Sequence, residues 1–133
     1  KIEPYNFVSA LNCVQAQRLV RTICAHCKHE VRASHELLVE SGLDPAKVAG
    51  FAFRSGRGCG QCRGTGYKGR RAIAEIMVLT DELREMIVAR EPIRALKDKA
   101  RANGTRFLRE SALALVREGV TNLQEVNRVT FVA

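Results

Sequence analysis

Apolar residues between positions 9 and 23 recur at steps of three and four, which is the spacing of one face of an α-helix. That face consists of Cys13, Ala16, Val20 and Ile23. The hydroxyl of Ser9 can cap the start of such a helix. We therefore predict a helix over 9–23, with Cys13 as a small core residue on its apolar side.

Two short helices are predicted for the next part of the chain. Ser34 can cap the first, and Gly42 can end it in the left-handed conformation. Asp44 followed by Pro45 is typical of the cap and first residue of the second.

Strands are predicted on either side of a glycine-rich loop. The run Phe-Ala-Phe at 51–53 favours a short strand, and six glycines make 55–69 a loop. The apolar run at 72–79 then predicts a strand with too little alternation to be exposed, so we expect it to be largely buried.

Four short amphipathic helices are predicted from Thr80 onward. Thr80 can cap the first, and Pro92 can begin the second. The third is expected between Thr105 and Gly119, and 121–124, Thr-Asn-Leu-Gln, matches a capping box for the last. Helices joined by such tight turns are expected to pack as a small bundle. The predicted fold class is therefore α+β and mostly helical.

The composition limits the kinds of protein that this chain can be, but it does not indicate one function. The chain has 133 residues and a net charge of +8, which is compatible with nucleic acid, an anionic membrane surface or an acidic partner protein. No apolar run reaches the roughly 18 residues of a membrane span, and no charged-then-apolar leader indicates secretion. The chain opens without a Met, so we expect it to be a piece of a longer protein.

Four cysteines form two C-x-x-C pairs: Cys24 with Cys27, and Cys59 with Cys62. In a chain without a secretory leader, paired cysteines favour a metal over disulfides. Four thiolates suit tetrahedral zinc and close its coordination shell, so the site is expected to be structural rather than catalytic. Free thiols or redox pairs are the alternative. The three histidines are expected to be solvated side chains: His26, His29 and His35.

The stretch 54–71 concentrates basic residues and contains no acid. Its basic members are Arg54, Arg57, Arg63, Lys68, Arg70 and Arg71. Cations beside thiolates lower their pKa and offset the charge of about −2 that zinc with four thiolates carries. The alternative is a surface that docks onto a partner protein, formed by Arg57, Arg63, Lys68, Arg70 and Arg71.

Motifs for catalysis are absent from the sequence. The phosphate loop G-x-x-x-x-G-K-[ST] has no match, because no Gly is followed by Lys. H-E-x-x-H and G-x-S-x-G have no match either. This chain alone is therefore expected not to be an enzyme and not to hydrolyse ATP.

Several motifs follow one another along nearly the whole chain. They are Gln15-Ala-Gln-Arg-Leu-Val-Arg21 before Cys24-x-x-Cys27, Gly58-Cys-x-x-Cys62, Thr65-Gly-Tyr-Lys-Gly-Arg70, Glu75, Glu118-Gly-Val-Thr121 and Glu125-Val-x-Arg-Val-Thr130. In this order they resemble the C-terminal third of type II secretion and type IV pilus assembly ATPases. Retraction motors of that superfamily generally lack the tetracysteine element, so the chain resembles an export or assembly motor.

The resemblance implies a cytoplasmic hexameric motor, peripheral to the bacterial inner membrane, with a RecA-like core that binds ATP and Mg²⁺ upstream of this chain. The implied parts are the last core helix at 1–23, a zinc-binding element at 24–70, and a region at 71–133 with a core-returning strand (72–79) and a helical C-terminal domain (80–133). The implied partners are the rest of the ATPase, the other subunits of a homo-hexamer, and an inner-membrane platform protein.

Two arginines lie where the core helix would meet the zinc-binding element. Arg18 and Arg21 are expected either to lie on a solvated helix face or to contact a neighbouring subunit or the phosphates of the nucleotide.

Two alternatives use parts of the same evidence. The segment Cys59-x-x-Cys-x-Gly64-x-Gly66 also resembles one repeat of the cysteine-rich domain of Hsp40 chaperones, but no glycine pair follows Cys24-x-x-Cys27. A zinc-stabilised nucleic-acid-binding module would suit the positive charge, but basic and aromatic residues do not interleave as base stacking requires. We therefore expect no nucleic-acid partner.

Overall fold

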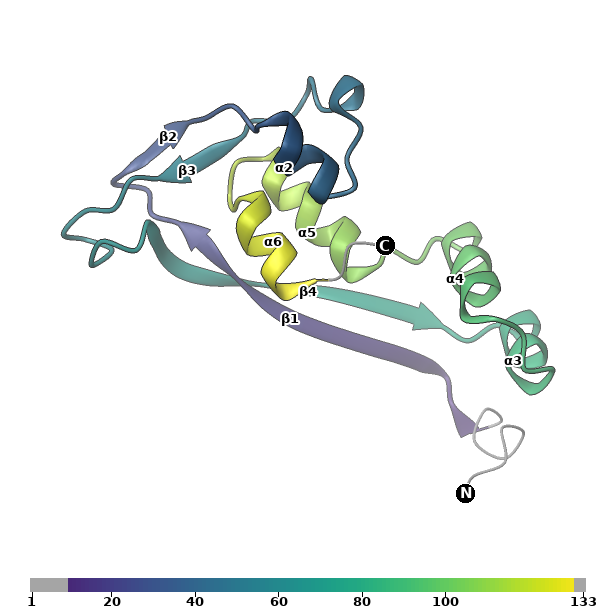
Figure 1. Cartoon of the computed structure of the whole chain (residues 1–133). Coiled ribbons are helices and arrows are strands. Elements are labelled where there is room, and N and C mark those ends of the chain that lie inside the picture. Colours follow the sequence, from purple (N-terminus) through teal and green to yellow (C-terminus); the bar gives the residue numbers. More distant parts are fainter. Residues whose placement is uncertain (1–9, 131–133) are drawn as a thin grey trace. The chain divides into compact units, whose positions relative to one another are not determined.

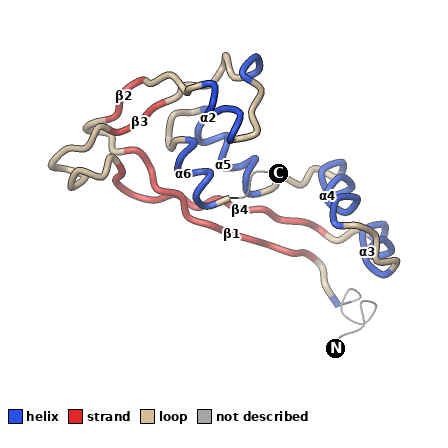
Figure 2. Tube along the Cα trace, viewed as in Figure 1, coloured by secondary structure: helices blue, strands red, loops and turns tan. Residues whose placement is uncertain are grey.

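The computed structural model describes residues 10–130, so the predicted cap Ser9 lies outside the described part (Figures 1 and 2). The chain divides into two compact units. Among the described residues, the first unit is formed by 10–16 and 74–107, and the second by 17–73 and 108–130. In chain order the elements are β1 (Cys13–Ile23), β2 (Lys28–Glu30), α2 (His35–Glu40), the 3-10 helix η1 (Pro45–Lys47), β3 (Arg54–Gly56), β4 (Tyr67–Val78), α3 (Asp81–Val88), α4 (Ile93–Ala102), α5 (Leu108–Arg117) and α6 (Leu123–Val129).

The helix predicted over 9–23 is wrong, because residues 13–23 form the strand β1. β1 pairs with β4 in a two-stranded sheet. Hydrogen bonds from Leu79 N to Asn12 O and from Cys24 N to Gly66 O, both 2.9 Å long, show that the two strands run in opposite directions. A partner strand that lies far away in sequence overrides a weak local helical pattern. Cys13 is consequently exposed rather than in the core.

β4 is both longer and less buried than predicted. It begins at Tyr67, inside the segment expected to be a loop, and ends at Val78. Ile76 is 51% exposed and Val78 is 61% exposed, although Ile73 is buried. A two-stranded sheet covers little of its own apolar surface, so the expectation of a largely buried strand is wrong.

In the second unit, the segment between the cysteine pairs folds around predicted caps. Ser34 caps α2, with Leu37 N donating to its Oγ at 3.1 Å, and Gly42 has the expected positive φ of 72°. Asp44 caps η1. The short strand β3 lies at 54–56, just after the predicted 51–53, and pairs antiparallel with β2.

One hydrophobic core joins this segment to the last two helices. Its buried members are Val20, Leu38, Ile73, Ala112, Leu115, Val116, Leu123 and Val126. They come from β1, α2, β4, α5 and α6, and Figure 1 shows α2, α5 and α6 beside one another. The residues between the two cysteine pairs therefore share their core with the C-terminal helices.

The four predicted C-terminal helices are present, but they do not belong to one unit. α3 and α4 lie in the first unit, where Thr80 caps α3 as predicted and Lys99 pairs with Glu82. α5 and α6 lie in the second unit. α6 is capped by Asn122 rather than Thr121, one residue later than predicted. The single helical bundle is therefore not confirmed.

Residues 10–130 contain no helix with the length and apolar character that crossing a bilayer requires.

Candidate functional site

Two turns bring the four predicted metal ligands together. Cys24 and Cys27 follow β1, and Cys59 and Cys62 lie between β3 and β4. Their four sulfurs lie within 4.8 Å of one another. The Sγ–Sγ distances are 3.8 Å for Cys24–Cys59, 3.8 Å for Cys27–Cys62 and 3.7 Å for Cys59–Cys62. A tetrahedron with Zn–S bonds of about 2.3 Å has edges of about 3.8 Å, so the donor set fits one zinc ion.

Backbone N–H groups point at two of these sulfurs. Gly58 N donates to Cys27 Sγ at 3.3 Å. Cys59 N and Gly66 N each donate to Cys62 Sγ at 3.2 Å. Gly66 has a φ of +81°, and a Cβ there would stand 2.6 Å from the carbonyl oxygen of Gly56, so only glycine fits. Such donors orient and stabilise thiolates, and Gly58 and Gly66 supply two of the three N–H groups.

Burial and these hydrogen bonds shift the pKa values of Cys27 and Cys62 in opposite directions. Burial raises the pKa of Cys27 to about 11, despite the N–H of Gly58. Burial also acts to raise the pKa of Cys62, but the N–H groups of Cys59 and Gly66 outweigh it and lower that pKa to about 6. The backbone N–H groups therefore favour the thiolate form at Cys62, whereas burial disfavours it at Cys27.

Histidine takes no part in this group among the described residues. His26 and His35 are exposed, as predicted for solvated side chains. The prediction is wrong for His29, which is half-buried, with an Nδ1 that has no hydrogen-bond partner within 10–130. Pairing of β2 with β3 places His29 opposite Ser55, and alternation along the strand turns it away from the face of its exposed neighbours.

The basic residues around the second cysteine pair are mostly exposed. Arg54 is the exception, being half-buried, with its Nη2 3.8 Å from Oε1 of Glu30. The exposed members are Arg57, Arg63, Lys68, Arg70 and Arg71, which we call the basic surface. Arg63 has a φ of 56°, a left-handed conformation that favours glycine or asparagine. These five side chains are available to a partner or to bulk solvent.

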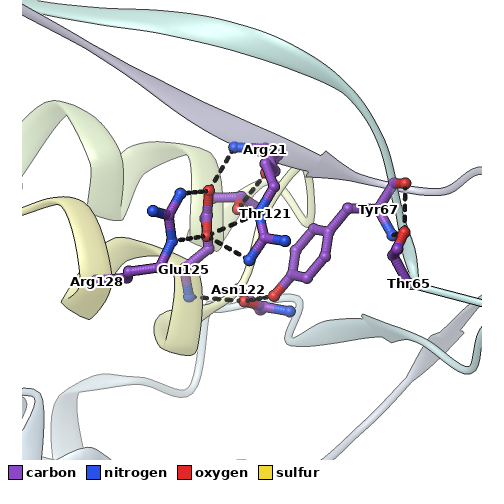
Figure 3. Close-up of polar contacts among 7 residues, drawn as sticks. All are labelled: Arg21, Thr65, Tyr67, Thr121, Asn122, Glu125 and Arg128. Atoms are coloured by element: carbon purple, nitrogen blue, oxygen red, sulfur yellow. Dashed lines mark hydrogen bonds and ion pairs between the residues drawn. The ribbon is translucent and has the colours of Figure 1, made fainter.

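A buried carboxylate lies at the start of α6 (Figure 3). The side chain of Glu125 is fully buried, and its oxygens accept five hydrogen bonds. Arg21 donates from its backbone N at 2.7 Å, from Nε at 3.2 Å and from Nη2 at 3.0 Å. Arg128 donates from Nε at 2.8 Å and from Nη2 at 2.9 Å. Burial acts to raise the pKa of Glu125, but the bonds from Arg128 and Arg21 lower it to about 2, so the carboxylate is charged at neutral pH.

Tyr67 and Asn122 complete this arrangement, which we call the Glu125 cluster. The guanidinium carbon of Arg21 lies 4.1 Å from the centre of the Tyr67 ring. The Tyr67 hydroxyl donates to Asn122 Oδ1 at 2.8 Å, and Glu125 N donates to the same oxygen at 3.0 Å (Figure 3). Tyr67, Asn122 and Glu125 each lie in a motif noted in the sequence, but none was predicted to form a site. A usable signal was the Asn-x-x-Glu spacing at 122–125, which is itself a capping-box pattern.

The two arginines predicted at a helix boundary instead lie on β1. Arg18 is exposed and borders a groove of about 380 Å³. The other residues of that groove are Leu19, Asn127, Arg128, Val129 and Thr130. Arg21 is held by Glu125 and Tyr67, so a solvated helix face is the wrong interpretation for it.

Comparison with known proteins gives matches along nearly the whole chain. A family model described as "Type II/IV secretion system protein" matches residues 1–128. "Type IV pilus assembly ATPase PilB" of Thermus thermophilus is 46% identical over 125 residues, covering 94% of this chain and 14% of the relative. PilB of Pseudomonas aeruginosa is 36% identical over 129 residues, covering 97% and 23%. "Type II secretion system protein E" of Pseudomonas aeruginosa is 39% identical over 129 residues, covering 97% and 25%. The chain therefore spans at most a quarter of the length of these relatives.

Proposed function

Since this chain belongs to the family of type II/IV secretion system proteins, we propose that it is the C-terminal, zinc-binding portion of a hexameric ATPase. The parent protein would power type II secretion or type IV pilus assembly, the two activities named for its relatives. The observation that carries the proposal is a family match over 1–128 that contains four converging cysteines. In the parent protein, ATP and Mg²⁺ would bind outside this chain, in a RecA-like core.

The zinc ion would be structural. When bound, it supplies four bonds that cross-link the two cysteine turns. These turns are far apart in the sequence, since Cys24 and Cys59, like Cys27 and Cys62, are separated by 35 residues. Four cysteine ligands leave no open coordination position, so the site would do no chemistry. The sulfur distances of 3.7 to 3.8 Å support this proposal.

The parts of the chain would keep the roles that the resemblance implies. Residues 1–23 would belong to the ATPase core, although 13–23 are a strand, and 24–70 would form the metal-binding element. The strand expected at 72–79 would return the chain to the core, and 80–133 would form the C-terminal domain. Arg18, exposed beside its groove, would contact a neighbouring subunit or the phosphates of the nucleotide; this role is less suited to Arg21, whose guanidinium is engaged by Glu125.

The basic surface would dock the motor onto a platform protein at the bacterial inner membrane, with the motor itself in the cytoplasm. Its five cations are exposed, and the described residues provide them with no ion pair. Complementary charge gives such an interface specificity and fast association. The alternative is that these cations only balance the charge of the zinc–thiolate centre.

A charge reversal separates docking from charge balance. Changing Arg57, Arg63 and Lys68 to Glu in the full-length protein is expected to abolish secretion or piliation while zinc content and ATP hydrolysis remain. Loss of zinc would support charge balance instead, and transport that continues with zinc retained would refute docking. The matched control reverses three other exposed cations that lie outside the basic surface: Arg32, Lys47 and Arg106.

A further inference from the structure

The last residues of β1 lie between the metal centre and the turn that joins α5 to α6. On one side, Cys24 is a predicted ligand, and its backbone N donates to Gly66 O at 2.9 Å. On the other side, Ile23 N donates to Val120 O at 2.9 Å, and Thr121 Oγ1 donates to Arg21 O at 2.8 Å. The backbone that carries the first ligand is thus bonded directly to the α5–α6 turn.

The start of β4 makes a second connection of the same kind. Gly66 donates its N–H to Cys62 Sγ, and the next residue is Tyr67. The Tyr67 hydroxyl bonds to Asn122, which caps α6, and its ring lies against the guanidinium of Arg21 (Figure 3). β1, which precedes the first cysteine pair, and β4, which follows the second, therefore each place one side chain on the start of α6.

Apolar packing in the second unit also connects the end of β1 to α5 and α6. Val20 lies on β1 shortly before the first metal ligand, and it is fully buried. It shares the hydrophobic core with Leu115, Val116 and Val126 of α5 and α6. α3 and α4 belong to the other compact unit and contribute no residue to this core among those described. The end of β1 is therefore tied to α5 and α6 by apolar contacts as well as by hydrogen bonds.

We propose that the metal centre positions α5 and α6, through Arg21 and Tyr67 acting on Glu125 and Asn122. The inference rests on the proposed zinc site. Without the metal, only weaker contacts hold the two cysteine turns together, namely the β2–β3 pairing and backbone hydrogen bonds such as Cys24 N to Gly66 O, and the ends of β1 and β4 separate more readily. Arg21 then no longer holds the buried Glu125 carboxylate, which cannot remain buried and charged with fewer partners. Loss of the metal therefore destabilises α5 and α6 and has little influence on α3 and α4.

Hydrogen exchange in the intact, reduced protein tests the proposed coupling between the metal centre and the last two helices. Exchange is compared before and after EDTA removes the zinc, and the zinc content is measured in the same samples. Zinc removal is expected to speed exchange in α5 and α6 by about tenfold, and in α3 and α4 by less than about twofold. Arg21→Met is expected to reduce the response of α5 and α6 to about threefold or less, because the link to β1 is weakened. Tyr67→Phe, which removes only the bond to Asn122, is expected to give a smaller reduction.

Arg128→Met is the matched control. Arg128 also donates two hydrogen bonds to Glu125, but from within α6, so its loss should leave the full response to zinc removal. Three results would overturn the proposal without contradicting the proposed metal site. They are a response to zinc removal confined to 24–66, an equal response in α3 and α4, and an unchanged response of α5 and α6 in Arg21→Met. Less than half an equivalent of zinc in the untreated protein would show that the metal site itself is wrong, and the proposal would fall with it.

Discussion

Replacing Glu125 with Gln removes the charge from the Glu125 cluster with little change in volume. The amide offers one acceptor oxygen where the carboxylate receives five hydrogen bonds, and its NH₂ group would face the donors of Arg21 or Arg128. The lowering of the pKa of Glu125 from 4.5 to about 2 corresponds to about 3 kcal/mol in favour of the charged form. Because the side chains of Arg21 and Arg128 are 42% and 57% exposed, solvent screening reduces the expected loss of stability to about 2 kcal/mol.

Hydrogen exchange of the α5 amides in the zinc-loaded protein measures this loss as a local free energy of opening. A loss of about 2 kcal/mol corresponds to exchange about 30-fold faster than in the wild type. Glu118→Gln, an exposed change in the same unit, is expected to cost less than about 0.5 kcal/mol. An effect of Glu125→Gln no larger than that of Glu118→Gln would refute the assignment of a charged, stabilising Glu125.

The difference between wild type and Glu125→Gln should also depend on pH. Folding lowers the pKa of Glu125, so its contribution is complete above about pH 5 and is lost as the pH falls toward 2. The two proteins should therefore converge in stability over that range. Both proteins also lose stability when their cysteines become protonated at low pH. Comparing the two at the same pH removes this shared loss from the difference.

Two further predictions concern the metal centre. Elemental analysis with native mass spectrometry should find one zinc per chain, and Cys59→Ser should retain less than half an equivalent; equal zinc content in the two proteins would contradict the ligand assignment. Gly66→Ala should also lose zinc, because its Cβ would stand 2.6 Å from Gly56 O. Gly104→Ala is the control, since Gly104 has a φ of +96° but no atom within 4 Å of the added Cβ. That variant should be destabilised only by left-handed backbone strain of about 1–2 kcal/mol and should keep its zinc. Zinc retention in Gly66→Ala would show that the loop can relax.

Features encoded within a few residues were predictable. The caps Ser34, Asp44 and Thr80 were identified because a cap needs only one side chain and the backbone two or three residues beyond it. The two cysteine pairs were identified for a similar reason, since each C-x-x-C turn already brings two sulfurs together, and the fold brings all four sulfurs within 4.8 Å of one another.

Features that depend on distant partners were not predictable. The segment 13–23 has an apolar spacing compatible with a helix, and only its pairing with β4 makes it a strand. No burial was predicted for Glu125, because one of the two arginines that stabilise its buried charge, Arg21, lies 104 residues away in the sequence. Local sequence was thus enough for the two cysteine pairs, for the caps Ser34, Asp44 and Thr80, and for the family resemblance. Only the folded chain shows that the segment between the two cysteine pairs and the last two helices share one core. Burial and strand pairing are set by contacts between segments whose local patterns contain no information about each other.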